Sequence, residues 1–274
     1  MEKAPVAARS LCALCAAIVL AISLPGGMAQ AQGPRPGEIL SQVLEHEELV
    51  APSPGVGEET ALRPCVARIS AGDERFGSGV ITRIGTDGIY VLTCAHVADQ
   101  VSETDPELYV TLFTGGEYAV EVAEVSETRD VALLKVDIAA LAPDELLRLR
   151  CVRGMAEVTA GERVYALTDE SSLITNPFVY GLSDYDLTGT HTHVGKSVVT
   201  GEVISPGIGV EVLHRELMAL DLEAVPGMSG GGVFTRDGSL AGIVVGRVDS
   251  GAGGGVTVAE PAGAIAEELP FLFR

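Results

Sequence analysis

The feature that most constrains the fold is a series of short apolar segments that repeats along the chain from about residue 61. The segments are rich in Val, Ile and Leu, and Gly and Asp, which favour turns, separate them. The chain has 33 Gly among its 274 residues, enough for many tight turns. No long helical pattern lies between the segments, which argues against a parallel sheet. We therefore expect an all-β fold of antiparallel strands.

The segments fall into two sets, and two antiparallel barrels in tandem account for them most simply. The first set contains about six expected strands: Val66–Ile69, Gly79–Ile81, Ile89–Leu92, Leu108–Phe113, Tyr118–Val125 and Val131–Val136. The second set contains Glu162–Leu167, Ser197–Ser205, Val210–Leu213, Leu217–Leu222, Val233–Phe234, Leu240–Val248 and Gly255–Val258. A connector near Ala139–Leu149 separates the sets, and Ala262–Leu269 predicts a short C-terminal helix.

Residues 1–31 have the pattern of a secretory signal peptide. Lys3 and Arg9 precede the apolar run Leu11–Leu24, and the small residues Ala29 and Ala31 suit cleavage after Ala31. An uncleaved membrane anchor is the alternative, but this run is shorter than the ~20 residues that a membrane-spanning helix needs. We therefore expect an exported protein, periplasmic or secreted, without stable membrane association after cleavage.

Residues 32–60 read as a leader or linker. Ile39, Val43 and Leu44 have helical spacing within residues 37–49, and a Pro- and Gly-rich stretch, Pro52–Gly57, follows them. A disordered leader, an inhibitory propeptide and a segment that contacts a partner all remain open for this part of the chain.

Charge and cysteine content restrict the partners and the redox chemistry. The formal charge is −20, and such a surface repels nucleic acid, so we expect no nucleic-acid partner. Signal cleavage would leave Cys65, Cys94 and Cys151, an odd number. Cys65 and Cys151 are candidates for one disulfide. Cys94, in an apolar strand, reads as a small buried hydrophobic residue.

Three segments carry residue types suited to nucleophilic catalysis. His96 ends the apolar segment Val91–Val97, Asp130 precedes an apolar strand, and Ser229 lies in the glycine-dense turn Gly227–Gly231. A serine hydroxyl needs a neutral imidazole to take its proton, and a buried carboxylate must orient that imidazole. The order His, Asp, Ser is that of the chymotrypsin arrangement. Each residue alone has a structural explanation, as a core histidine, a turn aspartate or a hairpin serine, but the combination favours a catalytic triad.

The glycines beside Ser229 suit a second requirement of acyl transfer. A tetrahedral intermediate needs backbone N–H groups directed at its oxyanion, and glycine adopts the dihedrals that such a turn requires. We therefore expect the N–H groups of Gly227 and Ser229 to form an oxyanion hole.

These segments resemble the trypsin-like serine peptidases, most of all the bacterial HtrA-type branch without a PDZ domain. The resemblance covers roughly Ala61 to the C-terminus and rests on five segments: Phe76–Ile81, Leu92–Val97, Arg129–Val136, Asp221–Gly231, and Leu240–Ile243 together with Gly255–Pro261. It implies a chymotrypsin-like fold of two six-stranded barrels, about 61–138 and 150–262, within a protease domain of 61–274. His96 and Asp130 would come from the first barrel and Ser229 from the second.

The same resemblance implies a serine endopeptidase that acts on protein or peptide substrates without a metal or cofactor. Val244–Arg247 would form the strand edge that pairs with an extended substrate. Two departures stand out. Met228 replaces the acid of the digestive members, so their zymogen switch is absent. HtrA-type relatives also carry a peptide-binding domain after the protease, and this sequence is too short for one.

The specificity residues remain open. Glu223 lies six residues before Ser229, where a carboxylate at the floor of the primary pocket would favour Lys or Arg in the substrate. In the HtrA-like alignment Asp221 and Val225 carry the local pattern instead, and the pocket would be apolar. Val225, Glu223, Val244, Val245 and Gly246 are therefore the candidate substrate-binding residues.

Two further interpretations are weaker. His191 and His193 have alternate spacing suited to zinc, but no clear third ligand accompanies them, so we expect no metal site. A catalytically silent protein that keeps the barrels for peptide or protein binding is the alternative to an active enzyme. The sequence does not indicate an oligomeric state.

Overall fold

The computed structural model describes residues 59–71, 75–99, 107–168, 198–210, 215–249 and 255–269. All of these residues belong to one compact unit, Pro36–Arg274. The predicted signal peptide, its cleavage site after Ala31, the helix expected within 37–49, and His191 and His193 lie outside the described residues. Those expectations, like the proposed domain boundaries, remain predictions.

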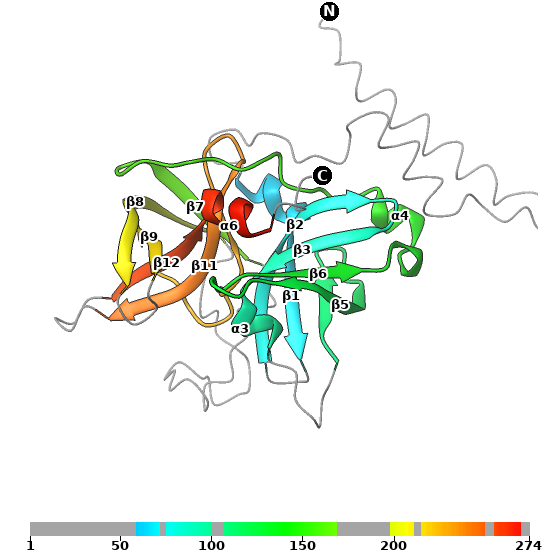
Figure 1. Ribbon diagram of the computed structural model, residues 1–274. Helices are drawn as coiled ribbons and strands as arrows, with labels where there is room; N and C mark the ends of the chain where they lie inside the picture. The colour runs from blue at the N-terminus through cyan, green and yellow to red at the C-terminus, as the bar shows by residue number, and fades with distance from the viewer. Residues whose placement is uncertain are drawn as a thin grey trace, which may run out of the picture. The chain divides into compact units, whose positions relative to one another are not determined.

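The first six strands close into an antiparallel barrel, in the order β1-β2-β3-β6-β5-β4 (Figure 1). Their bounds are β1 Val66–Ala71, β2 Arg75–Gly85, β3 Gly88–Thr93, β4 Tyr109–Leu112, β5 Glu117–Val125 and β6 Ala132–Val136. Closure leaves this sheet without the unpaired edges that would otherwise expose backbone groups.

Burial in this barrel follows the sequence pattern. The β3 segment Gly-Ile-Tyr-Val-Leu-Thr is buried at every position except Tyr90, and it pairs with β6 through Val91–Leu134 and Leu92–Leu133. Strand β5 carries three glutamates, Glu117, Glu121 and Glu124, and is exposed or half-exposed throughout. The side chains of β3 and β6 are therefore buried at nearly every position of the barrel wall, while β5 is the part of the wall most exposed to solvent.

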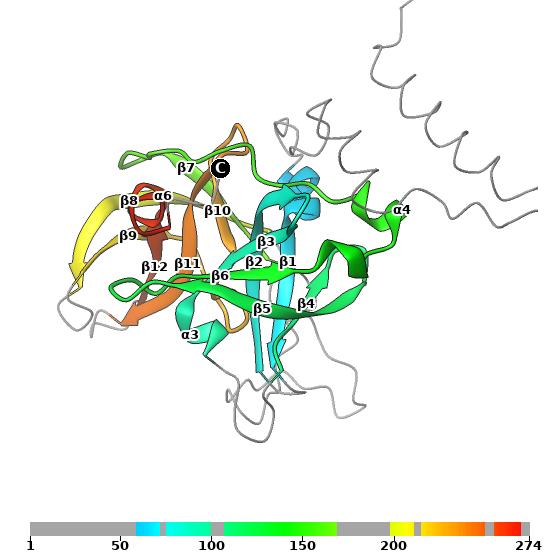
Figure 2. The ribbon, with the colours of Figure 1, turned by 45° about the vertical axis from the view of Figure 1, so that its right-hand side comes forward.

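Six further strands close into a second antiparallel barrel, in the order β10-β11-β12-β9-β8-β7 (Figure 2). Their bounds are β7 Arg163–Leu167, β8 Val198–Val210, β9 Arg215–Asp221, β10 Gly232–Phe234, β11 Leu240–Asp249 and β12 Gly255–Pro261. Two closed six-stranded antiparallel barrels confirm the fold class expected from the sequence.

The helical segments among the described residues are short. They are η1 Glu59–Cys65, α3 Ala95–Ala98, η2 Ile138–Ala140, α4 Pro143–Leu146 and α6 Ala262–Glu268. The predicted C-terminal helix is thus present as α6, and it contacts β11 and β12. Among the described helices, none has the length and apolar content needed to cross a membrane.

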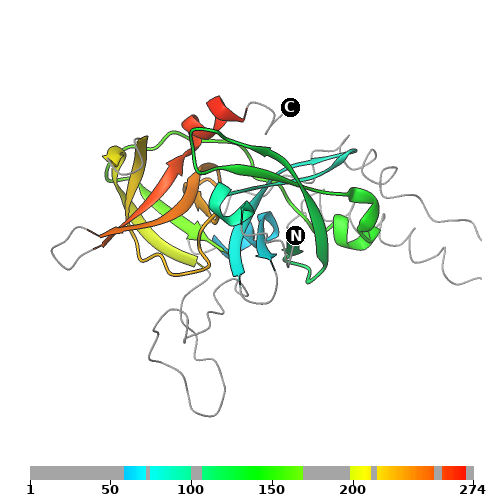
Figure 3. The same cartoon turned by 60° about the horizontal axis from the view of Figure 1, so that its bottom comes forward.

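The two barrels are joined by hydrogen bonds and by a shared apolar core. Ser78 N in β2 donates to Ser229 O at 2.8 Å, and Cys94 Sγ donates to Val244 O in β11 at 3.3 Å. The largest core cluster contains first-barrel residues together with Phe234 and Ile243 of the second barrel. In Figure 3, α3 lies where the strands of the two barrels approach one another. The expected catalytic segments lie along this junction.

Candidate active site

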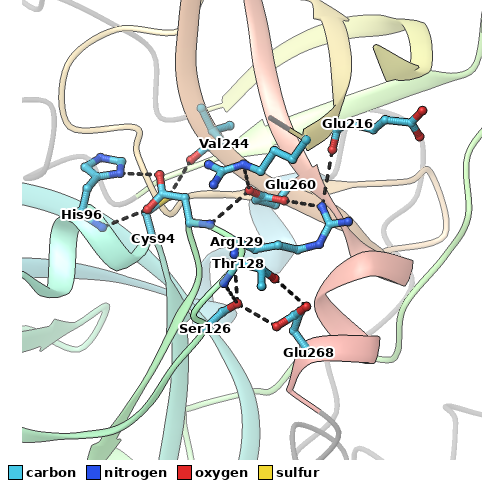
Figure 4. A network of polar contacts seen from close by, with 11 residues as sticks. Cys94, His96, Ser126, Thr128, Arg129, Glu216, Val244, Glu260 and Glu268 are labelled. Carbon is cyan, nitrogen blue, oxygen red and sulfur yellow. Dashed lines mark hydrogen bonds and ion pairs between the residues drawn. The ribbon is translucent and has the colours of Figure 1, made fainter. Parts of the chain in front are cut away.

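His96 lies in α3, directly after the buried strand β3. Its side chain is 46% exposed, whereas its neighbours Val97 and Ala98 are buried. One carboxylate holds the residue twice: His96 Nδ1 lies 2.6 Å from Asp130 Oδ2, and His96 N donates to Asp130 Oδ1 at 2.9 Å (Figure 4). The ring orientation and the start of α3 are therefore fixed by the same side chain.

Asp130 occupies the turn that leads into β6, and its side chain is 13% exposed. Burial alone would raise the pKa of this carboxyl. The hydrogen bonds from His96, together with the positive charges of His96 and Arg215, outweigh that effect and hold the pKa of Asp130 below its ordinary value. Asp130 is thus an ionised carboxylate, as an acceptor for the His96 ring must be.

Ser229 lies in the turn between β9 and β10, on the second barrel. Its hydroxyl donates to Val245 O at 3.1 Å. Within the described part of the chain, no hydrogen bond joins Ser229 to His96. The backbone of Ser229 nevertheless lies beside α3, because a Cβ on Gly77 would contact both Val97 and Ser229 O. The structure brings His96 and Asp130 into direct contact and places Ser229 opposite them across the barrel junction.

Steric constraints explain why glycine occupies the positions around Ser229. Gly227 and Gly230 have φ angles of 93° and 84°, which side chains rarely adopt. A Cβ on Gly230 would also lie 2.1 Å from Ser78 O and 2.4 Å from Thr93 Oγ1. Only glycine at 230 therefore allows the second barrel to approach the first this closely.

The two N–H groups expected to form an oxyanion hole are free of internal acceptors. Neither Gly227 N nor Ser229 N donates a hydrogen bond to another described residue. Gly227 O, in contrast, accepts from Ser78 Oγ at 2.7 Å, which orients the peptide that follows Gly227. Met228 is fully buried, and its Sδ accepts from Val225 N at 3.3 Å, so the thioether packs inside the turn.

The candidate substrate-binding residues differ in accessibility. Glu223 is exposed and Val225 is half-buried. Val244 is fully buried, and its carbonyl already accepts from Cys94 Sγ and Gly230 N. Val245 and Gly246 are partly exposed at a register shift between β11 and β12. Of the three β11 candidates, these two are therefore the ones that can meet a ligand.

The edge of β11 beyond Ile243 is available for pairing. Strand β10 pairs with β11 only as far as Ile243, while β12 pairs with the other edge as far as Asp249. Among the described strands, none occupies the remaining edge from Val245 onward. An extended peptide can add to this edge through main-chain hydrogen bonds.

Comparisons with known proteins agree with this fold. The family model for the trypsin-like peptidase domain matches residues 77–243, more than half of the chain. The chain belongs to the trypsin-like peptidase family. A search of curated proteins found no significant match.

Solved structures with the same fold include two of Rv3671c from Mycobacterium tuberculosis. The inactive form of a serine-to-alanine mutant is 18% identical, with a TM-score of 0.54 over 82% of this chain and 95% of that one. The inactive form of the Rv3671c protease is 19% identical, with a TM-score of 0.53 over 81% and 98%. A variant of the HtrA-type protease AlgW with a tripeptide is 22% identical, with a TM-score of 0.52 over 75% of this chain and 58% of that one.

In this member of the trypsin-like peptidase family, a hollow of about 370 Å³ adjoins His96. Ala95, Ala98 and Asp99 of the α3 region line one side of it, and Val122 and Val125 of β5 line the other. Val122 and Val125 are 41% and 49% exposed, unusual for large aliphatic side chains in this structure. The hollow therefore offers an apolar wall directly beside the imidazole.

Cys94, His96 and Asp130 form the one group among the described residues whose ligand atoms are spaced closely enough to hold a metal ion. Their chemistry does not suit that use. Burial raises the pKa of the Cys94 thiol well above its ordinary value, so the group stays protonated and donates to Val244 O. His96 Nδ1 is already bonded to Asp130. These contacts orient the imidazole rather than leave three free ligands.

Cys65 and Cys151, the candidate disulfide pair, are both free thiols in this structure. Burial and the neighbouring Cys151 raise the pKa of Cys65. Arg150 N donates to Pro64 O at 3.1 Å, so the two cysteines lie on adjacent backbone segments.

The sequence interpretation missed a group of charged residues behind Asp130. Glu260 in β12 is fully buried and forms ion pairs with Arg129 and Arg215 at 3.0 and 2.8 Å. The one sequence signal is a glutamate inside the apolar segment Val256–Pro261, where charges are rare unless paired. Its partners lie 131 and 45 residues away along the chain, and no local pattern connects them to it.

Proposed function

We propose that this chain is a serine endopeptidase that hydrolyses protein or peptide substrates through His96, Asp130 and Ser229. The observation that carries the proposal is the pair of hydrogen bonds that the Asp130 carboxylate accepts from His96, at 2.6 Å from Nδ1 and 2.9 Å from the backbone N. A proton held on Nδ1 by Asp130 leaves Nε2 as the free base. This arrangement is what a serine hydroxyl in the adjacent turn needs for activation.

The chemistry follows from these positions. Ser229 Oγ attacks the carbonyl carbon of the scissile peptide while His96 Nε2 takes the hydroxyl proton. The oxyanion that forms accepts hydrogen bonds from Gly227 N and Ser229 N, each such donor contributing about 3 kcal/mol to the transition state. The C–N bond then breaks, and His96 returns the proton to the leaving amine. Water repeats the sequence on the acyl-enzyme and releases the carboxylic acid.

The Ser229 hydroxyl must first turn away from Val245 O. In the described conformation it donates to that carbonyl at 3.1 Å. Exchanging one neutral hydrogen bond for another costs about 1 kcal/mol at most. That cost is small beside the 8–23 kcal/mol by which enzymes typically lower a barrier. The resting contact is therefore compatible with catalysis.

The substrate is expected to bind as an extended strand along β11. The unpaired edge from Val245 onward supplies main-chain donors and acceptors, and the hollow beside His96 accepts an aliphatic side chain through Val122 and Val125. The chain carries a predicted signal peptide, so we propose that the enzyme acts outside the cytoplasm. The reaction uses no cofactor.

A catalytically silent peptide-binding protein is the second candidate. The contact of Ser229 Oγ with Val245 O, rather than with His96, favours it. Such a protein would keep the β11 edge and the apolar hollow for recognition and would never form an acyl-enzyme.

Hydrolysis of fluorescein-labelled casein by the purified mature protein tests the proposal. We expect the wild type to release fluorescent peptides and Ser229→Ala to lose at least about 10³-fold in rate, because the nucleophile is removed. Equal hydrolysis by both proteins would contradict the role of Ser229. Binding of casein without hydrolysis by a folded wild-type protein would favour the silent candidate.

A further inference from the structure

Glu260 is a carboxylate buried in an otherwise small and apolar strand. It lies near the end of β12 with no exposed surface, after Val258 and Ala259, which are also buried. An ionised group is costly to remove from water unless it is paired and hydrogen-bonded. A residue that carries this cost at the junction of two barrels needs a reason beyond packing.

The contacts of Glu260 converge on the turn that carries Asp130. Glu260 Oε1 accepts from Asp130 N at 3.2 Å and lies 2.8 Å from Arg215 Nε. Glu260 Oε2 accepts from Arg129 Nη1 at 3.0 Å (Figure 4). Arg129 also donates to Glu216 O at 3.4 Å, which ties the same side chain to β9. Both oxygens of the carboxylate are thereby used.

This arrangement links the two barrels at the candidate triad. Asp130 belongs to the first barrel, while Glu260 and Arg215 belong to the second, which also carries Ser229. Hydrogen bonding from the Asp130 backbone N–H to Glu260 fixes where the turn sits relative to the second barrel. The Asp130 side chain is then free to hold His96. Through these contacts one buried carboxylate fixes the positions of His96 and Asp130 relative to the turn that carries Ser229.

A second acidic residue provides an internal comparison. Glu268 in α6 accepts from Ser126 Oγ at 2.8 Å and Thr128 Oγ1 at 2.7 Å, so it holds the same turn from its other end. In contrast to Glu260, Glu268 makes no hydrogen bond to Asp130 within the described residues. A comparison of the two glutamates therefore distinguishes anchoring of the turn, which both provide, from positioning of Asp130, which only Glu260 provides.

We propose that Glu260 is a positioning residue of the candidate active site, which it serves by holding the Asp130 backbone and balancing the charges of Arg129 and Arg215. The proposal rests on the serine peptidase function proposed above. Glu260 does not contact substrate or any reacting atom. It acts through Asp130, and through Asp130 on His96.

The charges near His96 predict how loss of Glu260 acts. Asp130, Cys94 and Asp99 lie beside His96, and the charged groups of Glu260, Arg129 and Arg215 lie behind Asp130. Replacing Glu260 with Gln removes one negative charge and leaves the positive charges of Arg129 and Arg215 without their direct ion-pair partner. Protonation of the imidazole then becomes less favourable, because an imidazolium is stabilised by nearby negative charge.

The test is the pH dependence of labelling by a fluorophosphonate probe in the mature protein. The labelling rate should fall at low pH as the general base is protonated, and this acid limb of the profile reports that protonation. For Glu260→Gln we expect this limb to move to lower pH by about half a unit, the size expected for one partly screened charge. The plateau should stay within about threefold of wild type, because the Gln oxygen still accepts from Asp130 N. Glu260→Ala removes that acceptor as well, and its plateau should fall about tenfold or more.

Glu268→Gln is the matched control, because it weakens the same turn without touching Asp130. Its acid limb should coincide with that of the wild type. A Glu260→Gln profile that overlays the wild type, or equal shifts in the two variants, would overturn the proposal and leave Glu260 as a structural residue. Glu260→Ala is not needed for this decision if it fails to fold.

An NMR titration of His96 separates failure of this proposal from failure of the proposed function. With histidine-labelled protein, the His96 resonance is identified by its loss in His96→Asn. If the wild type does not react with the fluorophosphonate probe, the proposed function fails. The titration midpoint of His96 then still decides the role of Glu260. A lower midpoint in Glu260→Gln than in wild type and Glu268→Gln supports it, and an unchanged midpoint overturns it.

Discussion

At the scale of single residues, the candidate site depends on an aspartate that stays ionised while largely removed from water. Asp130 keeps its charge because the side chain and backbone of His96 both donate to it and Arg215 lies nearby. Its carboxylate therefore orients an exposed imidazole without taking the Nδ1 proton from it. Loss of that charge should affect catalysis far more than folding.

Asp130→Asn tests this point. The amide resembles the carboxylate in shape but favours the wrong tautomer of His96, so we expect hydrolysis of labelled casein to fall by about 10³–10⁴-fold. Asp144→Asn, an exposed change in α4, should have no effect. Activity of Asp130→Asn within tenfold of the wild type would contradict the assigned role.

Val125 tests the apolar hollow beside His96. The side chain is 49% exposed, so Val125→Asp should leave folding intact. Placing a charge in the wall of the hollow removes about 1.5 kcal/mol of apolar contact with substrate, equivalent to a roughly tenfold lower kcat/KM on peptides with an aliphatic side chain there. Ile204→Asp, an equally exposed change in β8 outside the hollow, is the control. Equal kcat/KM values for the two variants would show that the hollow is not a subsite.

At the scale of elements, the glycine turn after β9 determines how closely the barrels approach. Gly230 N donates to Val244 O and Gly231 accepts from Val244 N, at 2.8 and 2.9 Å. Thr93 Oγ1 donates to Ser78 O at 2.8 Å, at the point where a Cβ on Gly230 would lie. The turn, β2 and β3 are therefore packed backbone against backbone.

Gly230→Ala should be strongly destabilising, because the new Cβ meets backbone atoms that cannot move aside and the φ angle is unfavourable. Two control variants separate the steric clash from the effect of the φ angle. Gly115→Ala has a positive φ but open space and should cost about 1–2 kcal/mol of unfolding free energy. Gly154→Ala has open space and no unusual φ and should change it by under about 0.5 kcal/mol. Urea denaturation measures all three, and equal losses at 230 and 115 would contradict the close approach.

The elements also show what the sequence could and could not predict. Alternating apolar residues and turns identified the strands of both barrels within a few residues. The strand expected to end at Ser205 continues as β8 to Val210, and all but the first residue of the separate strand expected at Val210–Leu213 lie outside the described residues. Register shifts after Val203 and after Ser205 each accommodate one extra residue of β8 relative to β9. Such a bulge depends on the neighbouring strand β9, so the local sequence alone does not indicate it.

The candidate site follows the same division. The order and neighbours of His96, Asp130 and Ser229 were visible because each lies at the end of a recognisable apolar segment or in a glycine turn. The place of Glu260 in the site was not visible, because it depends on a contact with Asp130, 130 residues away along the chain. The contact of Ser229 Oγ with Val245 O was equally hidden, since it arises from the bulge at Val245 in β11. Contacts between the barrels have no local sequence pattern.

At the scale of the whole molecule, charged contacts across the barrel junction make stability depend on pH. The pKa of Asp130 is lowered in the folded protein, so its contribution to the free energy of unfolding is complete above the unfolded value of about 3.9. It is lost as the pH falls through the lower, folded value.

Comparison with Asp130→Asn isolates this contribution. The excess unfolding free energy of the wild type over Asp130→Asn should shrink as the pH falls from about 4 to about 2, because the native carboxylate is protonated over that range. Urea denaturation at each pH measures the difference. A difference that grows between about pH 4 and pH 2 would contradict the ionised state assigned to Asp130.

The most direct test of the whole account is labelling of the mature protein with a fluorophosphonate probe, followed by mass mapping of the modified residue. The account predicts one label on Ser229, its loss in Ser229→Ala, and strongly reduced labelling in His96→Ala, because the hydroxyl is nucleophilic only with its base. A folded wild-type protein that takes no label, or takes it on another residue, would contradict the central claim that Ser229 is an activated nucleophile.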